Sequence, residues 1–335
     1  MVSFIELENI FGTKVTLCNV GASIYDIETV DYKGNAESIL YTTLKKDDFP
    51  YDGSYFGKTI GRTGGRISNS KFILNGMEYI IESDDPNGLH GGKDGLSFKE
   101  FNYEKMEDDS YITVIFSYLS KNMEAGYPGD LDLKVIYKLY KNINKLTINY
   151  VGVSNKDTLL NLSNHSYFNL SGNAKRDILG HELWINASKM EKIENLIPKD
   201  IVKCEKIYSF KNKHLIGDYL KESEIINNTN GYDFPYIFDE NDILKDNAKL
   251  KDCISKRTLT IRTTYPTVVL YTCNYVGDEI MNNEKKAMPY YAACLECMYH
   301  PNTINSDFLK DKKDVLVKNK KYDEKIELYF GVEND

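Results

Sequence analysis

Two of the five histidines stand in settings that suit the binding of a polar ligand. His90 is followed by two glycines in the motif NGLHGG (residues 87–92), and glycines let the backbone turn tightly beside an imidazole or approach a ligand closely. His165 lies among polar and aromatic residues in NLSNHSYFNL (residues 161–170), which suits a site where a sugar ring stacks and its hydroxyls are hydrogen-bonded. Each pattern alone is also compatible with a structural role. His90 could be a surface histidine in a turn, and His165 could be a buried histidine at the end of a strand.

An arginine and an aspartate stand in similarly distinctive settings. Arg66 follows a glycine-rich stretch in GRTGGRI (residues 61–67), from which a guanidinium could bind a ligand as a fork or form a surface salt bridge. No strand-turn-helix pattern surrounds this stretch, so it does not predict a nucleotide site. Asp233 is a lone acid among aromatic residues in GYDFP (residues 231–235), where it could bind sugar hydroxyls or cap a turn.

The segment from Cys294 to His300 contains three side chains that could ligate zinc, namely Cys294, Cys297 and His300. Its alternating pattern indicates a strand, however, and residues three apart in a strand point to opposite faces. No second C-x-x-C or H-x-x-x-H pair is present to complete a tetrahedral site, so we predict that the protein binds no metal there. Glu296 lies on the face opposite Cys297, near the strand end that Pro301 marks, where ligands can reach a carboxylate.

Short stretches in which apolar and polar residues alternate recur through the whole chain, which indicates strands. Strands must therefore position these side chains. The clearest predicts a hairpin in which residues 131–139 turn through 141–145 and return over 146–150. Further strands are predicted at residues 13–19, 111–119, 258–264, 267–274 and 292–298, and at a closing strand with Ile326, Leu328, Phe330 and Val332 on one face.

Helical periodicity is weak. The better helix candidates, residues 215–226 and 242–253, are short and polar, and we interpret residues 188–231 as loops and short elements. These patterns predict an all-β sandwich or barrel. Because no composition break or linker divides the chain, we expect one domain over residues 1–335.

Composition narrows the classes of function. The formal net charge is −8 and the basic residues are spread along the chain, which disfavours nucleic acid as a partner and favours a small neutral ligand. No apolar run approaches the roughly 18 residues of a membrane span, and the N-terminus does not resemble a secretory signal. We therefore expect a cytoplasmic protein that does not bind membranes and whose six cysteines are reduced thiols. A homodimer is compatible with the sequence.

Six motifs, taken together in their order along the chain, resemble those of the aldose 1-epimerases (galactose mutarotases): GRTGGRI, LHGG, NLSNHSYFNLSG, GYDF, LYTCN and CLECMYHPNTIN. The resemblance covers nearly the whole chain. It implies a large antiparallel β-sandwich, the galactose mutarotase-like supersandwich, with a few short helices and a sugar cleft across one sheet. It also implies an isomerase that interconverts the α and β anomers of free aldohexoses such as galactose and glucose, without a metal or other cofactor.

The same resemblance implies residue roles. Glu296 matches the general base that removes the proton of the anomeric hydroxyl, and His165 matches the acid that protonates the ring oxygen. The positions that hold ring and hydroxyl oxygens are matched by Arg66, His90 and Asp233, with Tyr167 as a further contact. Gly65 and Val269 depart from the family pattern, because they stand where Asn and Gln are common.

Three other functions compete with this interpretation. A hexose-6-phosphate 1-epimerase would need additional cationic side chains for the phosphate. A retaining glycosidase would use Asp233 and Glu296 as a carboxylate pair about 5 Å apart. A non-catalytic carbohydrate-binding protein of the same fold would bind sugars without changing the rate of anomer exchange.

Overall fold

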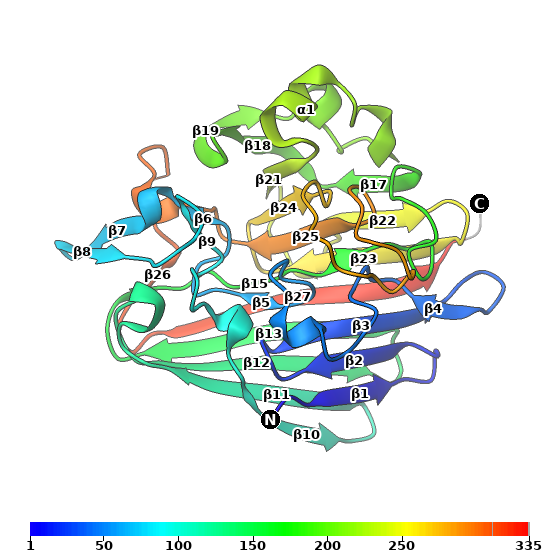
Figure 1. Cartoon of the computed structure of the whole chain (residues 1–335), viewed down its shortest axis with the longest axis horizontal. Coiled ribbons are helices and arrows are strands. Elements are labelled where there is room, and N and C mark those ends of the chain that lie inside the picture. The colour runs from blue at the N-terminus through cyan, green and yellow to red at the C-terminus, as the bar shows by residue number, and fades with distance from the viewer. Residues whose placement is uncertain (310, 334–335) are drawn as a thin grey trace.

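The computed structural model describes residues 1–309 and 311–333, whose regular secondary structure is mainly antiparallel strand. The largest sheet has nine strands, which in their order across the sheet are β10 (Asn102–Glu107), β11 (Tyr111–Ser120), β12 (Leu131–Tyr140), β13 (Lys145–Ser154), β27 (Lys321–Val332), β23 (Arg257–Thr263), β22 (Ala248–Asp252), β17 (His181–Ile185) and β20 (His214–Leu215). It forms one layer of the molecule (Figure 1).

Two smaller sheets form the opposite layer. The six-stranded sheet consists, in order, of β16 (Tyr167–Phe168), β25 (Ala293–Met298), β24 (Thr267–Tyr271), β21 (Asp233–Phe238), β18 (Ala187–Glu194) and β19 (Ile197–Lys203). The four-stranded sheet consists of β1 (Phe4–Glu8), β2 (Lys14–Cys18), β3 (Ser23–Val30) and β4 (Ala36–Ser38). One hydrophobic cluster contains buried residues of all three sheets, such as Val15, Val135 and Leu295, so the layers pack face to face as a β-sandwich.

The predicted hairpin shows why the sequence folds in this way. In β12 the alternate residues from Leu131 to Leu139 are buried, and Leu139 pairs with Leu146 at the start of the return strand β13. Alternation in the sequence therefore separates a core face from a solvent face, which is the usual behaviour of an antiparallel sheet with one covered side. The all-β fold class is confirmed.

Four short strand pairs lie outside the three large sheets, and two of them directly precede His90 and His165 in the chain. They are β5 (Thr59–Ile60) with β15 (Ser163–Asn164), β6 (Arg66–Ile67) with β9 (Gly88–Leu89), β7 (Lys71–Leu74) with β8 (Met77–Ile80), and β14 (Thr158–Leu159) with β26 (Val315–Leu316). His165 directly follows the first of these pairs along the chain, and His90 follows β9. Among the described residues, no helix has the length and apolar character that a membrane crossing requires.

One of the expected helices is absent and the other is shorter than expected. Residues 242–253 form no helix: their second half is strand β22, in which Ala248, Leu250 and Asp252 are buried between β17 and β23. Within residues 188–231, where loops and short elements were expected, β18 and β19 form a hairpin at the edge of the six-stranded sheet. The helix expected at 215–226 is reduced to α1 (Ser223–Thr229), and Leu215 belongs to β20 instead.

Candidate active site

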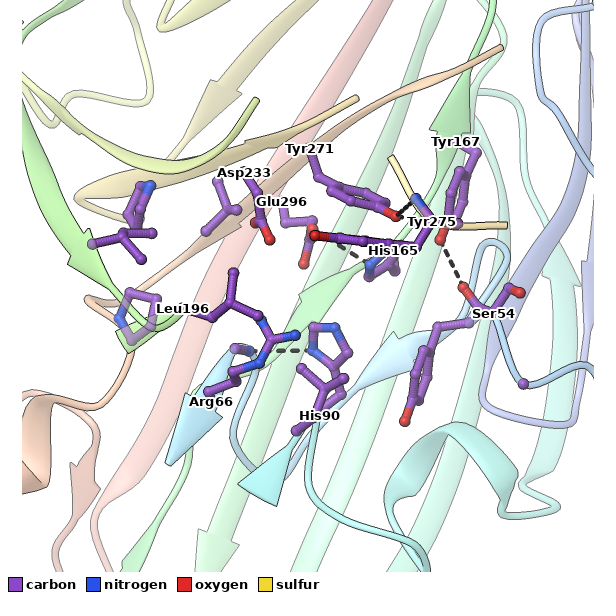
Figure 2. Close-up of a pocket in the computed structure, with 18 of the residues that line it drawn as sticks. Ser54, Arg66, His90, His165, Tyr167, Leu196, Asp233, Tyr271, Tyr275 and Glu296 are labelled. Carbon is purple, nitrogen blue, oxygen red and sulfur yellow. Dashed lines mark hydrogen bonds and ion pairs between the residues drawn. The ribbon is translucent and has the colours of Figure 1, made fainter. Parts of the chain in front are cut away.

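A pocket of 420 Å³ lies on the face of the six-stranded sheet that points away from the nine-stranded sheet (Figure 2). Its walls include all six side chains that the sequence analysis singled out: Arg66, His90, His165, Tyr167, Asp233 and Glu296. The structure therefore brings residues from five separate motifs to one place.

Strand register explains how the sheet floor of this pocket forms. Cross-strand pairing places side chains in two neighbouring rows on the same face, because residues two apart in a strand share a face. One row consists of Tyr167, Cys294, Tyr271 and Asp233. The next consists of Glu296, Val269 and Pro235. The intervening residues, such as Leu270 and Leu295, point into the core between the layers.

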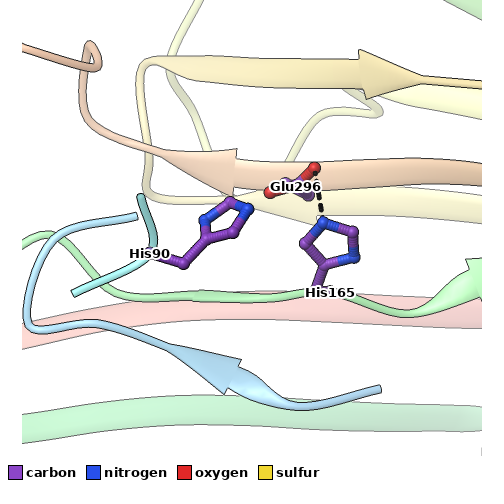
Figure 3. A group of neighbouring side chains, drawn as sticks. All are labelled: His90, His165 and Glu296. Atoms are coloured by element: carbon purple, nitrogen blue, oxygen red, sulfur yellow. Dashed lines mark ion pairs between the residues drawn. The ribbon is translucent and has the colours of Figure 1, made fainter. Parts of the chain in front are cut away.

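His165 and Glu296 form the central pair of the pocket. The Nε2 atom of His165 lies 3.4 Å from Oε1 of Glu296, and the two residues are 4% and 3% exposed (Figure 3). The backbone of His165 is fixed on both sides, because its N–H donates to the Lys58 carbonyl and its carbonyl accepts from the Gly57 N–H, each at 2.9 Å. This anchoring holds the imidazole over the strand that carries the carboxylate.

Burial shifts the pKa values of this pair in opposite directions. It lowers the pKa of His165 to about 4 and raises the pKa of Glu296 well above its usual range. The nearby Asp233 carboxylate raises the pKa of Glu296 further, and the Arg66 guanidinium lowers it. A carboxylic acid beside a neutral imidazole holds the same number of protons as a carboxylate beside an imidazolium, so the pair can exchange between these two forms without taking up or releasing a proton.

His90 approaches the same carboxylate from a tight glycine turn. Its φ is 48°, and Gly91 follows with a φ of 91°; a Cβ at Gly91 would lie 1.8 Å from the Gly61 carbonyl oxygen. The Gly65 N–H donates to Nδ1 of His90 at 3.2 Å, while burial and the positive charges of His165 and Arg66 hold the pKa of His90 well below its usual range. A neutral imidazole whose Nδ1 accepts a hydrogen bond carries its proton on Nε2. Nε2 is therefore a hydrogen-bond donor.

Arg66 and Asp233 supply opposite charges at the wall of the pocket. Arg66 combines both interpretations offered by the sequence, since its Nε forms an ion pair with Asp85 at 3.2 Å while its side chain also lines the pocket. Burial raises the pKa of Asp233 to about 6, and the Arg66 charge opposes this shift. Gly65, which precedes this arginine, has a φ of 72° and a Cβ there would lie 2.8 Å from Cβ of Pro301, so the close approach leaves little room for a larger residue.

Several lining residues were missed by sequence reasoning. Tyr271 could have been found, because it lies two residues after Val269 on β24 and so shares its face. Tyr55 gave no such signal, although its ring centroid lies 4.8 Å from that of His90. Leu196 belongs to the β18–β19 hairpin, within the region that was expected to consist of loops and short elements.

The side chains considered as zinc ligands do not converge. Cys294 contacts His165 on the pocket side, Cys297 packs in the core, and His300 forms an ion pair with Glu191. Within the described parts of the chain, the metal-ligating atoms of one group, His90, His165 and Glu296, lie within 4.8 Å of one another. The Gly65 hydrogen bond places the proton of neutral His90 on Nε2, which makes this nitrogen a donor to an oxygen and not a ligand for a metal ion.

Comparisons with known proteins identify the family of this chain. The family model described as aldose 1-epimerase matches residues 3–329. Galactose mutarotase of Rattus norvegicus is 29% identical over 296 residues, covering 87% of this chain and 84% of that protein. Aldose 1-epimerase of Haemophilus influenzae is 30% identical over 314 residues, covering 90% and 87%.

A solved structure shows the same fold. The GalM/aldose epimerase homologue from C. elegans superimposes with a TM-score of 0.90 at 24% sequence identity and covers 100% of both chains. The fold, the pocket and the match of the family model over nearly the whole length lead to one conclusion: this chain belongs to the aldose 1-epimerase family of isomerases.

Proposed function

We propose that this isomerase interconverts the α and β anomers of free aldohexoses such as galactose and glucose, with Glu296 as the general base and His165 as the general acid. One observation carries the proposal: the two groups lie 3.4 Å apart at the floor of a pocket that also contains Arg66, His90 and Asp233. Opening a cyclic hemiacetal requires one proton to leave O1 and another to reach O5. A carboxylate and an imidazolium side by side supply both transfers.

The proton movements balance over the reaction. Glu296 takes the proton of the anomeric hydroxyl, the C1–O5 bond breaks, and the protonated His165 delivers its Nε2 proton to O5. The aldehyde then rotates about the C1–C2 bond. In the reverse transfer, His165 takes the proton back from the O5 hydroxyl, the C1–O5 bond forms on the other face of the aldehyde, and Glu296 returns its proton to O1.

Burial favours the ring-opening step, in which Glu296 accepts a proton and His165 donates one. The raised pKa of Glu296 makes its carboxylate a stronger base, and the lowered pKa of His165 makes its imidazolium a stronger acid. After both transfers, each side chain is neutral, which is the state that a buried site stabilises. The pocket therefore lowers the free energy of the ring-opened state relative to the ion-paired state that precedes it.

The remaining polar groups hold the sugar. The Nε2–H of His90 is a fixed donor, the Arg66 guanidinium donates to ring or hydroxyl oxygens, and the Asp233 carboxylate accepts from hydroxyl groups. The Tyr167 hydroxyl donates to the Ser54 carbonyl at 2.8 Å, so this side chain offers the pocket mainly its ring and the remaining acceptor capacity of its oxygen.

Charge at the pocket favours a free sugar over a sugar phosphate. Arg66 is the one Lys or Arg side chain among the described residues that line it, and it is already paired with Asp85. The Asp233 carboxylate faces the same space and would repel a phosphate. The chain's net charge of −8 argues in the same way against nucleic acid.

Polarimetry tests the proposal. Freshly dissolved α-D-galactose and α-D-glucose are followed with and without the protein, and glucose 6-phosphate and an alkyl galactoside are examined in parallel. We expect faster approach to the equilibrium rotation for the free sugars, a much weaker effect on the phosphate, and no release of reducing sugar from the glycoside. Binding of galactose by calorimetry without any acceleration would identify a carbohydrate-binding protein and contradict the proposal.

A further inference from the structure

A cysteine that the proposed mechanism does not use lies directly behind the acid. Cys294 is fully buried on β25, two residues before Glu296, and its Sγ lies 3.6 Å from Nδ1 of His165. Strand pairing places it between Tyr167 and Tyr271, which line the pocket, while Cys294 itself packs in a buried hydrophobic cluster. Burial raises the pKa of the Cys294 thiol well above its usual range, so the sulfur stays uncharged.

The proton that His165 must transfer determines which atom of the Cys294–His165 contact is the donor and which is the acceptor. Nε2 faces Glu296, so Nε2 carries the proton that goes to the sugar and becomes the bare nitrogen afterwards. The imidazolium has a proton on both nitrogens, and the neutral ring that remains keeps its proton on Nδ1. Nδ1 is thus a donor throughout the cycle, and the atom placed to accept from it is the sulfur of Cys294.

We propose that Cys294 is a positioning residue for His165: its sulfur accepts the Nδ1–H and holds the ring with Nε2 toward Glu296 without adding a negative charge behind it. This inference rests on the proposed role of His165 as the acid. A carboxylate behind Nδ1, as in Ser-His-Asp triads, stabilises the imidazolium and makes the histidine a base. An uncharged thiol orients the ring and leaves the imidazolium free to give up its proton.

The other groups around His165 are consistent with this role. The titratable side chains that face its ring are His90, Tyr55, Tyr167, Tyr271, Cys294 and Glu296, with Arg66 and Asp233 also at the pocket. Of these, Glu296 is the carboxylate within ion-pair distance, and it lies on the Nε2 side. The ring also makes a hydrogen bond with the backbone of His165 itself, and the side-chain acceptor placed at Nδ1 is the Cys294 sulfur.

The test combines imidazole nitrogen NMR with matched variants. With only five histidines in the chain, the ¹⁵N signals of His165 can be assigned by their loss in His165→Asn. In the wild-type protein at neutral pH we expect a proton on Nδ1 of His165. Cys294→Ala should lower kcat about tenfold with KM changed less than about twofold, the size of effect expected when one hydrogen bond to a charged group is lost.

Two further variants separate positioning from a general loss of stability. Cys294→Ser retains an acceptor at the same place and should restore kcat to within about threefold of wild type, because a hydroxyl accepts at least as well as a thiol. Cys297→Ala is the matched control, since Cys297 is a fully buried cysteine on the same strand that packs in the core instead. It should leave kcat and the His165 signals unchanged, with folding checked by circular dichroism.

The outcomes distinguish this inference from the proposed function. A wild-type His165 with its neutral-ring proton on Nε2, or a folded Cys294→Ala with wild-type kcat, would overturn the role of Cys294 even if His165→Asn abolishes activity. Full activity in a folded His165→Asn would instead overturn the acid assignment on which the inference rests.

Discussion

His90 and His165 are two residues of the same type whose contacts differ, and we propose a different role for each. His90 has its Nδ1 bound by the Gly65 N–H and is a fixed donor, whereas His165 has Glu296 beside Nε2 and is placed to exchange a proton. The residue types and their motifs were predictable from the sequence. The hydrogen bond from Gly65 was not, because it depends on a backbone amide far from His90 in the chain.

Loss of the His90 donor should affect binding more than chemistry. We expect His90→Asn to raise KM about 3- to 10-fold, the range for one net hydrogen bond, and to lower kcat less than His165→Asn does. Steady-state polarimetry on galactose measures both constants. His214→Asn is the control, because His214 lies on β20 outside the pocket. An unchanged KM would show that His90 does not hold the sugar.

At the scale of elements, long strands with regularly alternating buried residues were predictable from the sequence. Short strands and strands with irregular alternation were not. The β12–β13 hairpin was predicted because its buried residues alternate over its whole length. In β22, five residues with lysines on the outer face gave too short a pattern to exclude a polar helix. The β18–β19 hairpin has a broken alternation, with a register shift between Lys192 and Ile193, so its contribution to the pocket could not be predicted.

The turn after β9 should be the most sensitive backbone element of the site. Gly91 and Gly76 have similar φ values of 91° and 78°. A Cβ at Gly91 would lie 1.8 Å from the Gly61 carbonyl oxygen, whereas a Cβ at Gly76 would have no atom of the described residues within 4 Å apart from its two chain neighbours. Gly76→Ala should therefore cost about 1 kcal/mol of unfolding free energy, for backbone strain alone. Gly91→Ala should cost at least about 2 kcal/mol more and raise KM, because the turn carries His90.

Urea unfolding and polarimetry on these two variants provide the measurement. Equal losses of stability for Gly91→Ala and Gly76→Ala, with KM unchanged in both, would show that the close approach at Gly91 is not needed to position His90.

At the scale of the whole molecule, sheet packing joins chain segments that are far apart in sequence. The main hydrophobic cluster contains residues from Ile5 to Phe330, and the pocket forms where the six-stranded sheet meets the segments that carry His90 and His165. The expectation of one domain over residues 1–335 stays a prediction, and it implies a single cooperative unfolding transition.

One buried carboxyl should make the stability of the whole molecule depend on pH. Burial raises the pKa of Asp314 in the folded protein to about 7, and its Oδ1 has no hydrogen-bond partner among residues 1–309 and 311–333. The folded state therefore keeps a proton that the unfolded state releases near pH 4, so this contribution to stability is present at low pH and is lost as the pH rises to about 7.

Replacement by the uncharged isostere should remove this dependence. We expect Asp314→Asn to be more stable than wild type at pH 8, by an amount of the order of 2–4 kcal/mol, and the two proteins to converge toward pH 4. Urea unfolding at a series of pH values measures the difference. A parallel pH dependence of the two proteins would mean that Asp314 is ionised in the folded state at neutral pH.

The rate of galactose anomer exchange in Glu296→Gln and His165→Asn tests the central claim most directly. Glutamine keeps the shape of the base but cannot accept the proton, and asparagine keeps polarity but cannot donate as a cation. Each variant, shown to be folded by circular dichroism, should have kcat lowered by at least roughly 10²-fold. The double variant should be little worse than the worse single one, because groups that act as a unit are not additive. A folded single variant that retains more than about a tenth of the wild-type kcat would contradict the account.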